Sequence, residues 1–288
     1  MAKFNHSKIM VVFAAHRREV LFLYNQINFK GEDKMQENEL KYYEEVGNWD
    51  FSQIKYKVER QTNWEFYSKI KENTNEKSLC LDLGTGGGER VLREYPDVGM
   101  IIATDFSESM INTAKENVKV YPERRVKFAL MDSMNMNLPK DIFDVVSARH
   151  TVINAKQIYD VLAPGGVVVI EGIDKKDCFE LKDLFKRGQA YKDKISIADK
   201  DYEDLKEAGF SKIEKIEIYE NEYYETPDDL MALLLKVPIL DDFSEINNEE
   251  FEHLTFIEKD IFDKYVAQNT TEKGISLKRV LYGIVAKK

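Results

Sequence analysis

Short, mainly apolar runs alternate with helix-like stretches from residue 79 to the end of the chain. The runs cover residues 79–83, 100–105, 126–133, 143–148, 167–170 and 279–286. Runs of this length are typical of parallel strands buried between two layers of helices. The pattern therefore predicts an α/β fold with a doubly wound, mostly parallel sheet over residues 75–288.

Two segments at the start of the chain fall outside this alternation. Residues 1–34 contain the apolar run 9–15, which is too short to span a bilayer, and we interpret them as an N-terminal extension of unassigned role. Residues 35–74 have a helical pattern with two aromatic clusters. They are predicted to form a helical cap.

A third segment, residues 223–274, is predicted to be an insert between the sixth and seventh strands. It contains a short apolar helix stopped by Pro238, since proline cannot continue a helix. An amphipathic, acidic helix is predicted over 248–268.

A glycine-rich turn follows the first strand of the sheet. Gly84, Gly86 and Gly88 come after Asp82 at a spacing of two. Glycine allows positive φ and close approach of a ligand, and the following helix start favours a polar or anionic group. The turn thus predicts a nucleotide-type site. A dinucleotide-binding turn would carry its third glycine where this chain has Glu89, which disfavours a nicotinamide-dependent oxidoreductase.

The order Asp-x-Gly-x-Gly-x-Gly resembles the first motif of the class I S-adenosylmethionine-dependent methyltransferases. Further landmarks follow in that family's order: Asp105 and Asp132 at strand ends, Leu-x-Pro-Gly-Gly at 162–166 and Ala-Gly-Phe at 208–210. The resemblance spans roughly residues 77–220 and the last strand. It implies a Rossmann-like sheet of seven mostly parallel strands. It also implies S-adenosylmethionine as cofactor and S-adenosylhomocysteine as product.

The resemblance also implies roles for residues at the strand ends. Asp82 would hold the amino-acid end of the cofactor, Asp105 the ribose hydroxyls and Asp132 the adenine amino group. A simple turn carboxylate is the alternative for Asp132. The other residues expected to bind the cofactor are Gly84, Thr85, Gly86, Gly88, Phe106, Met131, Ser133 and Arg149.

Arg149 and His150 follow the fourth strand, where ligands gather in open α/β sheets. They are the candidate catalytic residues: His150 would deprotonate or orient an acceptor, and Arg149 would hold a carboxylate. Structural hydrogen bonding is the alternative for both.

Tyr43, Trp49 and Trp64 are candidate residues of an acceptor pocket, because helices at this place in the family close over cofactor and acceptor. Aromatic side chains at helical spacing also fit simple packing. We expect the insert and the aromatic stretch 42–64 to enclose the pocket together.

Composition narrows the class of partner. The 288 residues carry a net charge of −10, which argues against a surface that follows nucleic-acid phosphates. Cys80 and Cys178 have neither metal-ligand spacing nor a disulfide pattern, so no metal is expected, and a reducing cytoplasm fits. No membrane partner is expected, and the oligomeric state is not indicated.

The expected reaction is in-line displacement of a methyl group from sulfonium sulfur to a small-molecule acceptor. The protein would mainly align the acceptor and exclude water, and a base is needed only if the acceptor loses a proton. Two alternatives remain open: an rRNA or tRNA methyltransferase, and a non-catalytic protein that binds the cofactor.

Overall fold

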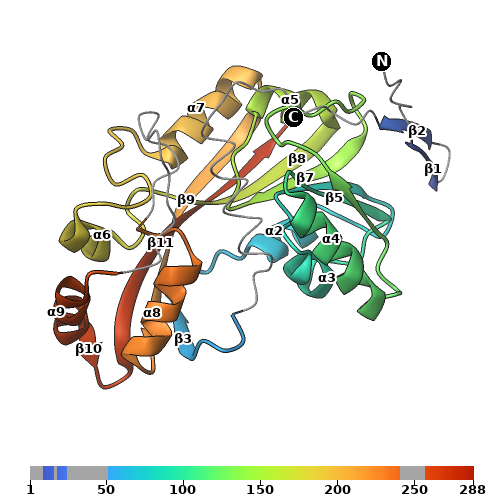
Figure 1. Cartoon of the computed structure of the whole chain (residues 1–288). Coiled ribbons are helices and arrows are strands. Elements are labelled where there is room, and N and C mark those ends of the chain that lie inside the picture. Colours follow the sequence, from blue (N-terminus) through green and yellow to red (C-terminus); the bar gives the residue numbers. More distant parts are fainter. Residues whose placement is uncertain (1–8, 16–17, 25–50, 241–256) are drawn as a thin grey trace, which may run out of the picture.

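The structure, a computed structural model, describes residues 9–15, 18–24, 51–240 and 257–288. Its main feature is a mixed sheet with helices on both faces (Figure 1). The strands lie in the order β3-β9-β11-β8-β7-β4-β5-β6, and the short β10 pairs with β11. The parallel strands are β4 (Leu79–Leu83), β5 (Met100–Asp105), β6 (Val126–Leu130), β7 (Phe143–Arg149) and β8 (Leu162–Ile173).

The antiparallel side of the sheet consists of β3 (Tyr56–Arg60), β9 (Ser211–Tyr224), β10 (Thr270–Thr271) and β11 (Gly274–Lys287). The prediction of a doubly wound, mostly parallel sheet is confirmed for its centre. The count of seven strands was too low, because β3 and β10 extend the sheet to nine.

The chain changes direction across the sheet beside β4. From β4 it passes outward to β5 and β6, and it returns to β7 on the other side of β4. Ligands of open α/β sheets bind at such a switch point, outside the carboxyl ends of the strands. The topology therefore places the expected site at the ends of β4 and β7.

Alternate residues of the parallel strands pack on opposite faces, as the two-residue period of a strand requires. Cys80, Val145 and Val169 join a core with α2 (Phe66–Glu72) and α3 (Glu89–Glu94). Leu81 and Val146 point to the other face, toward α5 (Ala155–Val161) and α7 (Ile197–Ala208). Figure 1 shows these helices as two layers, with α4 (Glu108–Asn117) beside α3.

The long strands β9 and β11 extend beyond β8. Their pairing continues to Ile275 opposite Tyr224, whereas β8 ends with Ile173 opposite Leu281. The extension has its own apolar core, which includes Leu234 and side chains from three helices. These helices are α6 (Phe179–Phe185), α8 (Pro227–Lys236) and α9 (Lys259–Asn269), which Figure 1 shows around the far end of β9 and β11.

The predicted insert is thus helical, with two differences from the expectation. Its two ends belong to strands: residues 223 and 224 to β9, and residues 270–271 and 274 to β10 and β11. The second helix is described from Lys259, while residues 248–256 of the predicted helix lie outside the described residues.

The prediction of a helical cap over residues 35–74 was wrong for residues 56–60. These residues form β3, an antiparallel edge strand whose Tyr56 stacks on Tyr224 of β9 with ring centroids 5.3 Å apart. The unpaired backbone groups at the edge of β9 offer hydrogen bonds that local helical periodicity does not reveal. Only α2 of the described cap is helical, and residues 35–50 lie outside the described ranges.

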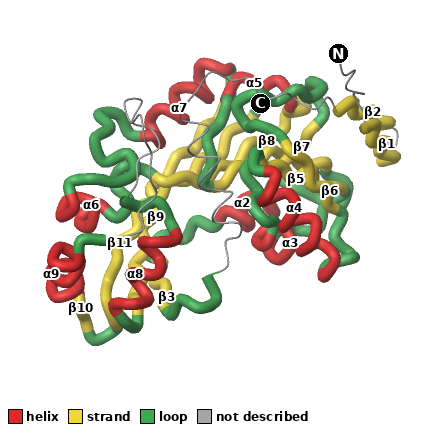
Figure 2. The backbone as a smooth tube through the Cα atoms, viewed as in Figure 1, coloured by secondary structure: helices red, strands yellow, loops and turns green. Residues whose placement is uncertain are grey.

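Near the N-terminus, β1 (Ile9–Ala15) and β2 (Arg18–Tyr24) form an antiparallel hairpin that is a sheet of its own (Figure 2). Within the described ranges, no helix is long and apolar enough to cross a membrane.

Candidate active site

The predicted cofactor residues gather at one edge of the sheet. Asp82 lies near the end of β4, Asp105 ends β5, Asp132 follows β6 and Arg149 ends β7. The parallel pairing of these four neighbouring strands brings their carboxyl ends together. The structure therefore brings together residues that are up to 67 positions apart in the sequence.

The glycine turn after β4 is held in shape by the chain itself. Gly84 and Gly88 have φ values of +68° and +76°, which are strained for residues with a side chain. A Cβ atom would lie 2.6 Å from the Cβ of Thr151 at Gly84 and 2.7 Å from the ring of Phe128 at Gly88. Both glycines are thus required by conformation and by packing.

Asp105 ties this turn to the end of β5. Its Oδ2 accepts a hydrogen bond from the backbone N–H of Gly86 at 2.8 Å, and its Oδ1 accepts one from Ser107 at 3.0 Å. The carboxyl is 6% exposed, and burial raises its pKa despite these bonds. Each carboxylate oxygen has a second lone pair, so Asp105 can still accept hydrogen bonds from a ligand.

Asp82 is a deeply buried acid of the site. It is 4% exposed, and its Oδ1 accepts a 2.6 Å hydrogen bond from Ser147 on β7. Burial raises the pKa of Asp82 to about 7, while the Ser147 and Thr85 hydroxyls act in the opposite direction. The hydroxyl oxygen of Thr85 is nevertheless buried without a hydrogen bond of acceptable geometry. Asp82 and Thr85 thus retain hydrogen-bonding capacity at the turn.

Asp132 is half-buried and organises the turn after β6. Its Oδ1 accepts a 2.8 Å hydrogen bond from the backbone of Met134. Ser133 donates to the carbonyl of Val152 at 2.9 Å, and Met131 is 6% exposed in the core. The turn-carboxylate alternative for Asp132 therefore has direct support, and its free lone pairs leave the adenine role as a prediction.

Arg149 and His150 lie beside a buried acid on the next strand. The Nε of Arg149 donates to Oε1 of Glu171 on β8 at 2.6 Å, and Nε2 of His150 lies 3.4 Å from the same oxygen. Burial alone would raise the pKa of Glu171, but the charge of Arg149 and the neighbouring His150 hold it at about 2. Glu171 is therefore a carboxylate at neutral pH.

His150 has a left-handed backbone, with φ of +52°. Such a conformation costs a non-glycine residue on the order of 1–3 kcal/mol, and a 2.8 Å hydrogen bond from its N–H to the carbonyl of Glu171 helps to hold it. Burial and Arg149 lower the pKa of His150 to about 4, and Glu171 opposes them. The imidazole is therefore neutral at pH 7.

The sequence prediction missed Glu171. The signal was present, because an acid directly follows the apolar run Val167–Ile170. Glu171 shares a sheet face with Val167 and Val169 by strand alternation, and it pairs in register with Arg149. Like Asp105, Glu171 is an acid near the carboxyl end of a buried parallel strand.

The same sheet face has a second group of buried charges on the β9–β11 extension. Arg279 donates to both carboxylate oxygens of Asp177 at 2.9 and 3.0 Å and to Glu222 at 3.0 Å. Glu222 also accepts a 2.5 Å hydrogen bond from Tyr224. These side chains lie between the core of the sheet and the core of the insert.

The structure places Trp64, a predicted acceptor-pocket residue, within a core, which favours the packing alternative. Its side chain is 6% exposed in the core of the α2 and α3 face, and its ring packs on Gly283 of β11, where a Cβ atom would lie 2.5 Å away. A ring enclosed in this way offers no surface to an acceptor. Tyr43 and Trp49 lie outside the described residues.

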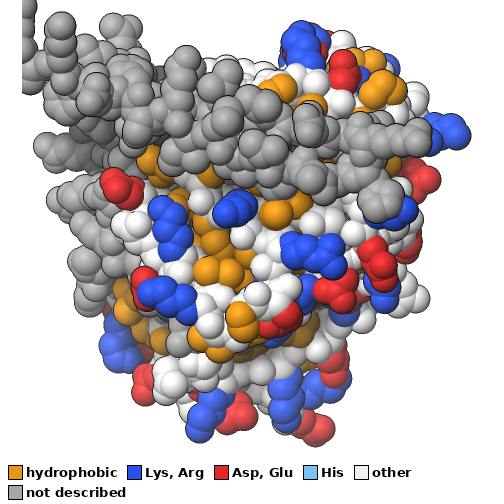
Figure 3. Space-filling model, turned by 90° about the vertical axis from the view of Figure 1, so that its right-hand side faces the viewer, with side chains coloured by type: hydrophobic (Ala, Val, Ile, Leu, Met, Phe, Trp, Pro, Cys, Tyr) orange, Lys and Arg blue, Asp and Glu red, His pale blue; other side chains and the backbone are white. Residues whose placement is uncertain are grey.

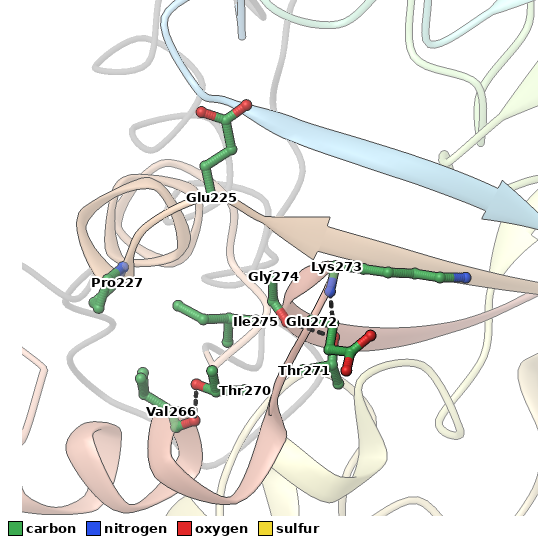
Figure 4. A pocket seen from close by; sticks show the side chains of 9 residues that line it. All are labelled: Glu225, Pro227, Val266, Thr270, Thr271, Glu272, Lys273, Gly274 and Ile275. Atoms are coloured by element: carbon green, nitrogen blue, oxygen red, sulfur yellow. Dashed lines mark hydrogen bonds between the residues drawn. The ribbon is translucent and has the colours of Figure 1, made fainter.

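A shallow hollow elsewhere on the molecule does not belong to this site. Figure 4 shows it between α8, α9 and the β10–β11 turn, lined by Glu225, Pro227, Val266 and residues 270–275. None of the predicted site residues lines it. We assign it to the packing of the insert. In the part of the chain that the structure describes, no cluster of three or more His, Cys, Asp or Glu side chains is suited to hold a metal ion.

Comparisons with known proteins match the part of the chain that carries the glycine turn and the strand ends. Residues 80–166 match the family model described as a methyltransferase domain. Phosphoethanolamine N-methyltransferase 3 of Arabidopsis thaliana is 29% identical over 117 residues, which cover 38% of this chain and 24% of that protein. Demethylmenaquinone methyltransferase of Lactococcus lactis is 33% identical over 99 residues, covering 31% of this chain and 39% of that protein. The matches thus span less than half the length of these relatives.

A solved structure extends the likeness of fold to most of the chain. The [4+2]-cyclase SpnF is 16% identical, with a TM-score of 0.53 over 89% of this chain and 96% of that protein. At this identity the likeness concerns the fold alone. The matched domain, the switch-point site and the order of motifs together identify this chain as carrying the domain of the class I S-adenosylmethionine-dependent methyltransferases, whose cofactor is S-adenosylmethionine.

Proposed function

We propose that this protein transfers the methyl group of S-adenosylmethionine to a small-molecule acceptor. The observation that carries the proposal is the set of buried or half-buried acids at the ends of adjacent parallel strands: Asp82, Asp105 and Asp132. They flank a glycine turn at the switch point of the sheet, which is where nucleotide cofactors of such folds bind.

The residues present fit this cofactor. The buried, unpartnered hydroxyl of Thr85 and the remaining lone pairs of Asp82 suit the polar amino-acid end of the ligand. Asp105 can accept from a ribose hydroxyl, because the backbone N–H groups of Gly86, Phe106 and Ser107 do not use all the lone pairs of its carboxylate. When bound, the cofactor supplies an electrophilic methyl group on positively charged sulfur.

The protein's own residues then bind and orient the acceptor. Arg149 and His150 stand at the end of β7, the strand that pairs with β4, and this position supports the proposal that they face the acceptor. Because Glu171 already holds the Nε of Arg149, the guanidinium is oriented by that pair. We assign Arg149 to binding an anionic group of either the cofactor or the acceptor.

Surface charge supports a small acceptor over nucleic acid. The face drawn in Figure 3 mixes Lys and Arg with Asp and Glu side chains rather than presenting a continuous basic field. A net charge of −10 points the same way. Two relatives are named for phosphoethanolamine and demethylmenaquinone, so phosphorylated amines and quinone-type phenols are the acceptor classes to test first. We expect the insert and the cap to enclose the acceptor.

Asp105 provides the test of cofactor binding. Asp105→Ala removes charge-assisted hydrogen bonds to the ribose hydroxyls, so we expect affinity to fall by roughly 30- to 150-fold, or about 2–3 kcal/mol. Titration calorimetry with S-adenosylmethionine measures it. Asp105→Asn keeps one oxygen that can accept a hydrogen bond from the turn. A loss of affinity in this variant therefore reports lost contact with the ligand rather than damage to the turn.

Asp201→Asn is the matched control. Asp201 is also buried, but it lies on α7 at the other face and accepts a 2.5 Å hydrogen bond from Tyr282. Its substitution should leave cofactor affinity unchanged. Equal affinity of wild-type protein and both Asp105 variants would refute the assignment. Cofactor binding without transfer of labelled methyl to any amine, phenol or tRNA would favour a non-catalytic role.

A further inference from the structure

Glu171 connects the two candidate catalytic residues. One of its oxygens, Oε1, accepts the 2.6 Å hydrogen bond from Arg149 and lies 3.4 Å from Nε2 of His150. The acid is 4% exposed. Nε2 of His150 is itself buried and has no hydrogen bond of acceptable geometry. Nε2 of His150 and Oε1 of Glu171 are thus neighbours, but their separation is longer than that of a good hydrogen bond. Catalytic hydrogen bonds are often long before ligands bind.

The charge on Glu171 decides which nitrogen of His150 carries hydrogen. A neutral imidazole has one N–H donor and one lone pair. If Nε2 carried the lone pair, that lone pair would face a buried carboxylate oxygen, and the two would repel. Hydrogen on Nε2 instead creates an attractive contact with Oε1. The lone pair then belongs to Nδ1.

The same geometry makes Nδ1 the nitrogen available to a ligand. The side chain of His150 is 27% exposed, although Nε2 is buried. The exposed part therefore belongs to the other atoms of the side chain, and Nδ1 is the ring nitrogen left to meet a ligand. The left-handed backbone of His150, tied to the carbonyl of Glu171, keeps the ring beside β8.

We propose that Glu171 is a positioning residue that holds His150 in the Nε2–H tautomer, so that Nδ1 acts as the proton acceptor for the methyl acceptor. This inference rests on the proposed function. It specifies the acceptor as one whose nucleophilic atom carries a proton, such as a hydroxyl or an amine.

Methyl transfer and proton transfer together conserve atoms and charge. The nucleophilic atom forms a bond to the methyl carbon, the carbon–sulfur bond breaks, and its electron pair stays on sulfur. The proton of the nucleophile passes to Nδ1 of His150, giving an imidazolium that Glu171 stabilises and that later releases the proton to water. Asp–His pairs act by the same orientation and charge stabilisation in acyl transfer.

Charged groups on three strands act electrostatically on the imidazole of His150: Arg149 on β7, Glu171 on β8 and Arg279 on β11. The two arginines disfavour the imidazolium, and Glu171 is the group among them that favours it. Loss of the Glu171 charge therefore lowers the pKa of His150 further and leaves a weaker base.

The test is the tautomer of His150, read by proton–nitrogen NMR at pH 7 on cofactor-free, ¹⁵N-labelled protein. The chain has four histidines, and a His150→Asn variant assigns the signal. We expect the Nε2–H form in wild-type protein and a mixed or reversed tautomer in Glu171→Gln, which keeps the shape but removes the charge. Asp201→Asn is the matched control and should leave the His150 signal unchanged.

An Nδ1–H tautomer in wild-type protein would overturn the proposal, and this result does not depend on the folding of Glu171→Gln. A folded Glu171→Gln protein with the wild-type tautomer would overturn it as well. Because the measurement uses neither cofactor nor turnover, a wrong tautomer is distinguishable from failure of the proposed function, which appears as absent cofactor binding or methyl transfer.

Discussion

Buried carboxyl groups dominate the site at the scale of single residues. Asp82, Asp105 and Glu171 are each at most 6% exposed. Their pKa values nevertheless shift in different directions: upward for Asp82 and Asp105, and downward for Glu171. An adjacent guanidinium keeps Glu171 ionised, with a pKa of about 2. Asp82 has only hydroxyl partners, and its pKa rises to about 7. The neighbours of each acid therefore decide whether it carries charge in the cofactor-free protein.

Asp82 should make the cofactor-free protein less stable as pH rises. Its folded-state pKa of about 7 lies above the usual 3.8, so the native state binds more protons than the unfolded state between these values, and stability falls as pH rises through them. We expect Asp82→Asn to remove this loss. Its advantage should grow from about pH 4 to about pH 7, to at most about 4 kcal/mol, and stay constant above.

Thermal or urea unfolding of both proteins across that pH range measures the effect. Asn keeps an oxygen to accept the Ser147 hydroxyl, so packing is conserved. A difference between the two proteins that does not change with pH would show that the charge of Asp82 is not its cause.

At the scale of elements, the β9–β11 extension depends on a buried ion cluster. Arg279 binds Asp177 and Glu222 with its side chain 12% exposed, and the two acids have exposures of 4% and 10%. The cluster joins the segment after β8 to two strands of the antiparallel side. On β11 the cluster is flanked by Leu281 of the sheet core and Leu277 of the insert core.

We expect Arg279→Met to lower the free energy of unfolding by about 3–5 kcal/mol, because it leaves two buried carboxylates unpaired. Lys278→Met is the matched control one position away. Lys278 pairs with Glu180 at 2.6 Å, but both side chains are more than half exposed, so its loss should cost under about 1 kcal/mol. Urea unfolding compares them, and similar losses in both variants would show that burial of the Arg279 cluster adds nothing.

At the scale of the whole molecule, the N-terminal hairpin stands apart from the main sheet. Within the described residues, β1 and β2 pair only with each other. The strands that position the site begin at β4, and β3 is the first to join their sheet. Removal of residues 1–34 therefore breaks no strand pair of the nine-stranded sheet.

A protein that begins at Met35 should bind S-adenosylmethionine within about twofold of the full chain, a change under about 0.5 kcal/mol. Its melting temperature should also match that of the full chain. Calorimetry and thermal unfolding of the two proteins check this. A tenfold loss of affinity would place part of residues 1–34 at the cofactor site.

The sequence alone determined the central sheet and the cofactor edge of the site. Buried parallel strands read as short apolar runs, and the glycines and acids at their ends occupy positions set by local backbone geometry. The positions of Asp82 and Gly84 were predictable because one continuous strand and turn carry them, and that of Asp105 because it ends the next apolar run.

Only the tertiary structure decided the rest. Residues 56–60 became a strand because β9, more than 150 residues later, offers an open edge. Trp64 proved to be core because Gly283 of β11 leaves room for its ring. Glu171 contacts Arg149 at the end of the neighbouring strand and His150 directly after it. Each of these depends on pairing between distant segments, and local periodicity carries no information about which segments pair.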